Sequence, residues 1–127
     1  MINTKDKVNF EDLKDVHPNL LVLLVYAYQY ARRYELPFTI TSIKDRFSGR
    51  ISKSHEEGRA IDLSVKAWPE FHILRLTKKM NEEFESIGAI SKSDGISRAC
   101  VYHKVEGNAW HFHLQVRATL NLYYKFA

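Results

Sequence analysis

The chain has 127 residues, of which 45% are hydrophobic and 27% are charged, and its net charge is +4. This length fits one domain, and this composition excludes wholesale disorder. The single cysteine, Cys100, excludes an internal disulfide, and its apolar neighbours predict a buried, inert thiol. The polar start lacks the apolar core of a secretory signal, and the most apolar stretch, residues 20–31, is too short to span a bilayer. We therefore expect synthesis in a cytoplasm and no membrane span.

Residues 10–34 have the pattern of two helical segments. Asn9 is a suitable cap for a first turn, and Pro18 is well placed to start a second, longer helix, because proline is tolerated at the first helical position. Pro37 then ends the helical pattern. The following residues, 38–41, are aromatic and β-branched and predict a strand.

The middle of the chain predicts a loop, a strand and a helix. Residues 45–57 are polar and indicate a loop, whereas residues 60–65 alternate between apolar and polar types, as in a half-buried strand. Pro69 is expected to open a helix that runs to about residue 87 and ends at Gly88. The inner face of this helix is predicted to carry Phe71, Leu74, Met80 and Phe84.

Two further strands are predicted, at about residues 98–105 and 110–118, with a turn at residues 106–108. The order of elements is then helix, strand, strand, helix, strand, strand. This order favours one α+β domain, in which helices pack on one face of a small, mostly antiparallel sheet.

The segment from Ser54 to Asp62 is the strongest local signal of chemistry. His55 and Asp62 are seven residues apart, which does not suit a pair on one helix face but suits a loop histidine and a strand aspartate. Gly58 permits a tight turn between them. Asp62 lies between apolar neighbours, where an unpaired carboxylate is costly, and a metal ion would supply its partner.

Residues 110–117 form the second signal. In a strand, residues two apart share a face, so His111 and His113 are expected side by side, with Phe112 and Leu114 on the other face. Two histidines and an aspartate with one open position form a typical catalytic zinc site. The alternative is that the histidine pair belongs to a solvated sheet surface. His17 and His72 are predicted to have structural roles.

The run from His55 to Asp62 resembles the SxHxxGxAxD motif of zinc D-alanyl-D-alanine carboxypeptidases and of related phage L-alanyl-D-glutamate endopeptidases. The signalling domain of hedgehog proteins shares that zinc site. The resemblance covers roughly residues 10–118, and Lys53 stands where the motif has its serine. It implies that His55, Asp62 and His113 bind Zn2+, with His111 beside the reacting centre or as the third ligand in place of His113.

The resemblance also implies an activity: zinc-dependent hydrolysis of an amide bond in bacterial peptidoglycan peptides, as a carboxypeptidase or an endopeptidase. Glu106 is the best available general base, with His103 and His111 as substitutes. His111, with Arg50, would stabilise the oxyanion. Arg46 or Arg50 would bind a substrate carboxylate. A bacteriophage origin is expected, with action on the cell wall after release, as an endolysin, or as a virion component.

Two other functions compete with this hypothesis. A non-catalytic binding or virion structural protein of the same fold would keep zinc for stability. A nucleic-acid binder would draw only on the net charge of +4 and on scattered aromatic residues, so nucleic acid is not the expected partner. The oligomeric state follows from none of these patterns.

Overall fold

The computed structural model describes residues 2–5, 8–43, 58–104 and 109–118. The helices are η1 (Phe10–Asp15, a 3-10 helix), α1 (Pro18–Arg33) and α2 (Glu70–Glu83), and the strands are β1 (Asn3–Thr4), β2 (Thr39–Ser42), β3 (Ala60–Ser64), β4 (Ala89–Ile90), β5 (Ser97–Arg98), β6 (Cys100–His103) and β7 (His111–Gln115). Among the described helices, none is long and apolar enough to cross a membrane.

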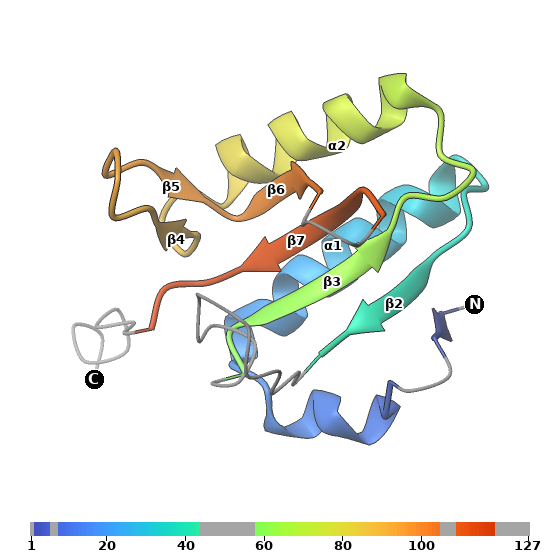
Figure 1. Ribbon diagram of the computed structural model, residues 1–127, viewed down its shortest axis with the longest axis horizontal. Coiled ribbons are helices and arrows are strands. Elements are labelled where there is room, and N and C mark those ends of the chain that lie inside the picture. Colours follow the sequence, from blue (N-terminus) through green and yellow to red (C-terminus); the bar gives the residue numbers. More distant parts are fainter. Residues whose placement is uncertain (1, 6–7, 44–57, 105–108, 119–127) are drawn as a thin grey trace.

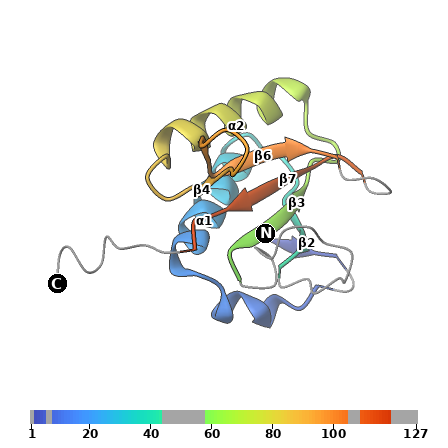
Figure 2. The ribbon, with the colours of Figure 1, turned by 60° about the vertical axis from the view of Figure 1, so that its left-hand side comes forward.

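Five strands form one sheet in the order β1-β2-β3-β7-β6, and β4 pairs with β5 in a small second sheet. The pairing of β1 with β2 is parallel and the other pairings are antiparallel. Helix α1 runs across the back of β3 and β7, and α2 lies along β6 (Figures 1 and 2). The predicted α+β class, with helices on one face of a mostly antiparallel sheet, is confirmed.

Helix α1 begins and ends where the sequence indicates. Pro18 occupies its first turn, and the His17 side chain caps it, because Nδ1 accepts a hydrogen bond from the Asn19 N–H at 3.2 Å. Glu35 has a positive φ of 55° just after the helix. The side chains of α1 that face the core recur at spacings of three and four residues, and they are Leu20, Leu23, Leu24, Ala27, Tyr30 and Ala31.

Helix α2 is shorter than predicted and turned about its axis. It ends at Glu83, with Phe84 as its C-cap. Phe71 and Leu74, which we expected on the inner face, are 64% and 54% exposed. The buried residues of the helix are Ile73, Leu76 and Met80. This face is selected because Asn81, one residue after Met80, bonds the backbone of Ala99 and Cys100 through its side-chain amide.

Gly88 is not the helix cap that its position suggested. It forms an isolated antiparallel bridge with Val116 and lies against the start of β5. A β-carbon at position 88 would lie 2.7 Å from the backbone nitrogen of Ala99, so only glycine fits there. The adjacent pairing of β4 with β5 was not predicted, because two-residue strands carry almost no periodic signal.

The alternation of side chains in β3 and β7 separates the two faces of the sheet. Ile61, Leu63, Phe112 and Leu114 are fully buried in the core that also contains the inner faces of α1 and α2. Asp62, His111 and His113 alternate with them and therefore lie on the opposite face, which neither α1 nor α2 covers.

Candidate metal centre

Strand pairing brings Asp62 and His113 together from distant parts of the chain. β3 pairs with β7 in a register that places Asp62 opposite His113 and Ser64 opposite His111. Asp62 is 6% exposed and His113 is 9% exposed, so both side chains are buried although they lie on the face away from the helices. The two halves of the predicted site therefore meet at the centre of the sheet.

The Asp62 carboxylate and the His113 imidazole are in direct contact. His113 Nδ1 lies 2.8 Å from Asp62 Oδ1. Because a carboxylate oxygen can only accept a hydrogen bond, His113 Nδ1 carries the proton and donates the hydrogen bond to Asp62. A charge-assisted hydrogen bond of this kind offsets part of the cost of burying the carboxylate between Ile61 and Leu63.

His111 is held in one tautomer by its own backbone neighbour. Its Nδ1 lies 3.0 Å from the Ala109 carbonyl oxygen and therefore donates to it. In the neutral ring, Nε2 is then the acceptor, and it lies 3.1 Å from His103 Nε2 and 3.7 Å from Asp62 Oδ2. The expected placement of His111 beside His113, on one face, is confirmed.

His103 joins this group from the next strand. β6 pairs with β7 so that His103 lies opposite His111, and its ring centroid is 5.4 Å from that of His113. In the sequence, His103 was only a substitute for the general base. The alternation of residues 100–103 could have placed it on a face, but only the pairing of β6 with β7 places it beside His111. We call Asp62, His103, His111 and His113 the histidine–aspartate cluster.

The cluster offers part of a metal site. In the portion of the chain that the structure describes, no three His, Cys, Asp or Glu side chains already form a group that could hold a metal ion. Asp62 Oδ1 and His113 Nδ1, 2.8 Å apart, would have to separate by about 0.5 Å, because two ligand atoms of tetrahedral zinc lie about 3.3 Å apart. Nδ1 would also lose its proton. The pair therefore fits two of the three predicted ligands after a small adjustment.

The remaining predicted site residues fall outside the described part of the chain: His55, Arg46, Arg50 and Glu106. The connection toward His55 is described from Gly58 onward. Gly58 has a φ of +73°, which glycine adopts readily, and its carbonyl oxygen accepts a hydrogen bond from the His17 N–H at 2.9 Å. Gly58 therefore has the backbone conformation that a tight turn before the aspartate strand requires, and the rest of that predicted turn lies outside the described residues.

Two histidines of the cluster lie where their strands meet the connection between β6 and β7. His103 is the last residue of β6 and His111 is the first of β7, so the segment containing Glu106 follows one of these histidines in the chain and precedes the other.

Comparisons with protein-family models, curated proteins and solved structures found no match for this chain. The candidate site therefore depends on the chemistry of its own residues and on the motif in which they occur.

Proposed function

We propose that this protein is a zinc-dependent peptidase that hydrolyses an amide bond in peptides of bacterial peptidoglycan. One observation carries the proposal: the buried Asp62 carboxylate lies against the imidazoles of His113 and His111 on the face of the sheet that α1 and α2 leave open. A structural aspartate needs one good partner. An aspartate beside two imidazoles has the donor atoms that zinc prefers.

His55, Asp62 and His113 would hold the metal. Zinc is a Lewis acid that makes water nucleophilic at neutral pH and polarises a substrate carbonyl. Asp62 and His113 are held in place before any metal binds, because neighbouring strands carry them and their contact is buried. Such preorganisation reduces the cost of assembling the site.

The other residues of the cluster would handle charge and protons. His111 uses Nδ1 to bond the Ala109 carbonyl, so Nε2, which lies 3.1 Å from His103 Nε2, is the nitrogen that would turn to a substrate. When protonated, it would donate to the carbonyl oxygen on which negative charge develops. Glu106, in the segment between His103 and His111, would accept the proton of the attacking water and return it to the leaving amine.

The experiment measures zinc and cleavage in the same preparation. The purified chain is analysed for metal content and incubated with muropeptides, whose products are identified by mass spectrometry. We expect about one zinc per chain and release of a peptide fragment. Glu106→Gln should keep the zinc and lose cleavage by at least about 100-fold, which is the usual contribution of a general base.

Glu85→Gln is the matched control, because Glu85 is exposed and lies just after α2, outside the three strands that carry the cluster. It should retain both zinc and activity. Zinc without cleavage by the wild type would reject the peptidase and leave a non-catalytic zinc-stabilised protein. Absence of zinc would reject the metal centre as well.

A further inference from the structure

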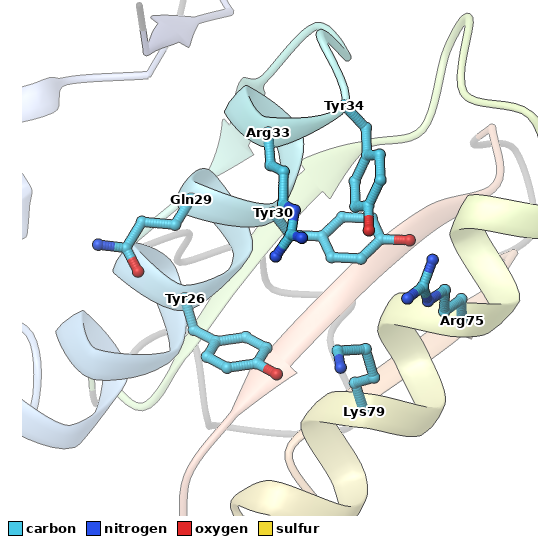
Figure 3. A pocket seen from close by; sticks show the side chains of 7 residues that line it. All are labelled: Tyr26, Gln29, Tyr30, Arg33, Tyr34, Arg75 and Lys79. Atoms are coloured by element: carbon cyan, nitrogen blue, oxygen red, sulfur yellow. The ribbon is translucent and has the colours of Figure 1, made fainter.

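A second site lies between the two long helices, on the other side of the sheet from the cluster. A pocket of about 240 Å³ opens there. The residues that line it are Tyr26, Gln29, Tyr30, Arg33 and Tyr34 from α1 and its C-cap, with Arg75 and Lys79 from α2. Figure 3 shows Arg75 and Lys79 extending from α2 toward the tyrosines of α1, and Arg33 extending from α1 on the same side as these tyrosines. We call this space the interhelical pocket.

The lining of the interhelical pocket is cationic. It contains Arg33, Arg75 and Lys79 and no aspartate or glutamate. Within the described part of the chain, none of these three side chains forms an ion pair. Lys78, by contrast, is not part of the lining and pairs with Glu82 at 3.9 Å. Among the described residues, no carboxylate is therefore paired with the three cations that line the space between the helices.

Aromatic rings support the two guanidinium groups. The Arg33 and Arg75 guanidinium carbons lie 5.7 Å and 5.5 Å from the centroid of the Tyr34 ring, and Arg75 also lies 5.8 Å from the Phe71 ring. These cation–π contacts restrict both arginine side chains without neutralising them. They also give the exposed Phe71 a role, as part of the support for Arg75.

Tyrosine hydroxyls complete the lining with neutral donors. Burial raises the pKa of Tyr30 in spite of the opposing charge of Arg75, and burial together with Glu83 raises the pKa of Tyr26. Both hydroxyls therefore stay protonated at neutral pH. The Tyr30 hydroxyl lies 2.8 Å from His72 Nδ1, which fixes its position in the lining of the pocket.

We propose that the interhelical pocket binds a phosphate group carried by a small molecule. Three cations and no carboxylate suit a dianion better than a singly charged carboxylate. Arginine matches phosphate oxygens with two parallel N–H donors, and lysine adds a point charge. The pocket is smaller than the roughly 300–1,000 Å³ of typical sites for drug-sized ligands, which favours a compact group.

The test is a titration of the full chain at low salt, followed by NMR and calorimetry. The probes are inorganic phosphate, glycerol 1-phosphate and acetate, with vesicles containing phosphatidic acid to detect a lipid source of the phosphate. We expect saturable binding of the two soluble phosphates, weaker binding of acetate, and shifts of resonances from Arg33, Tyr34 and Arg75.

Arg33→Gln with Arg75→Gln should weaken phosphate binding at least about tenfold, because each lost hydrogen bond to a charged group contributes at least that much. The control, Arg32→Gln with Lys78→Gln, removes the same charge from the same two helices outside the pocket. Binding to vesicles alone, with the same loss in the pocket variant, would assign the phosphate to a lipid headgroup. Absence of binding in every arm, or equal loss in the control, would overturn the proposal. The test measures phosphate binding alone, so its result does not depend on whether the protein binds zinc or cleaves peptides.

Discussion

The contact between Asp62 and His113 allows two roles for the carboxylate. If the proposed zinc binds, Asp62 would be either a ligand itself, as the motif predicts, or the partner that orients His113 while the other ring nitrogen, Nε2, binds the metal. The 2.8 Å hydrogen bond fits both, since zinc-binding histidines usually donate their other N–H to a carboxylate or carbonyl. The two roles differ in how much affinity Asp62 contributes.

Asp62→Asn should separate these roles. The amide keeps the shape of the side chain but is a poor zinc ligand. We expect zinc affinity, measured by competition with a chelating dye, to fall by more than about 100-fold. A loss of about 10- to 100-fold is typical of an orienting partner and would contradict direct ligation. Asp94→Asn is the control, because Asp94 pairs with Arg98 at the surface and should not affect zinc.

At the level of single residues, the sequence predicted which side chains share a face but not which ones meet. The spacing of His111 and His113 was enough to place both on one face of β7. Their approach to Asp62 depends on the register between β3 and β7, whose contacting residues are 51 positions apart in the chain. Cys100 was predictable from its neighbours: burial raises its pKa to about 12, so the thiol is inert.

The cap of helix α1 should make stability depend on pH. Burial, together with the charge of Arg59, lowers the pKa of His17 from its ordinary value of 6.5. The folded state therefore favours the neutral ring, whose Nδ1 accepts the Asn19 N–H. Above pH 6.5 the cap contributes fully to the free energy of unfolding. This contribution is lost as the pH falls below 6.5, because His17 binds a proton more readily in the unfolded chain than in the folded one.

Urea midpoints at pH 7.5 and 5.5 test this cap. The wild type should lose more stability between these two values than His17→Asn, because asparagine caps a helix with an oxygen that does not titrate. The other histidines are common to both proteins and cancel in the comparison. Equal pH dependence in the two proteins would exclude His17 as the source.

Asn81 connects helix α2 to the sheet, and its loss should be costly. Its side-chain oxygen accepts from the Ala99 and Cys100 N–H groups, and its amide donates to the Cys100 carbonyl. Asn81→Ala leaves these groups without partners beside the core. We expect a loss of about 2–4 kcal/mol in the free energy of unfolding, measured with urea. Lys78→Ala, at an exposed position, should change it by less than about 0.5 kcal/mol.

The same residue explains why the buried face of α2 was predicted correctly at Met80 but incorrectly at Phe71 and Leu74. The helix offers two apolar series at helical spacing, and hydrophobic periodicity alone does not choose between them. The polar contacts of Asn81 with β6, together with the packing of Ile73, Leu76 and Met80, turn the second series inward. Phe71 and Leu74 are left on the outside, and Phe71 contacts Arg75.

For the whole molecule, one layer of helices on one face of the sheet creates two separate chemical environments. The open face holds the histidine–aspartate cluster, and the covered face holds the interhelical pocket beyond the core. The α+β class was predictable because helical and strand periods alternate clearly along the chain. The position of the cluster was not, because it requires the long-range pairing of β3 with β7 and of β6 with β7.

Zinc should therefore stabilise the whole domain, since its ligands would come from distant parts of the chain. A ligand that binds only the folded state adds about 2.7 kcal/mol at 100 times its Kd. For a domain of this size, that corresponds to a rise of roughly 10 °C in Tm, measured by differential scanning calorimetry of metal-free protein with and without zinc. Magnesium should have no such effect, because it prefers oxygen ligands.

His113→Ala should abolish the rise in Tm that zinc causes, whereas Arg33→Gln, in the interhelical pocket, should retain it. An equal rise in His113→Ala would show that zinc binds elsewhere and would remove the cluster from consideration as the metal centre.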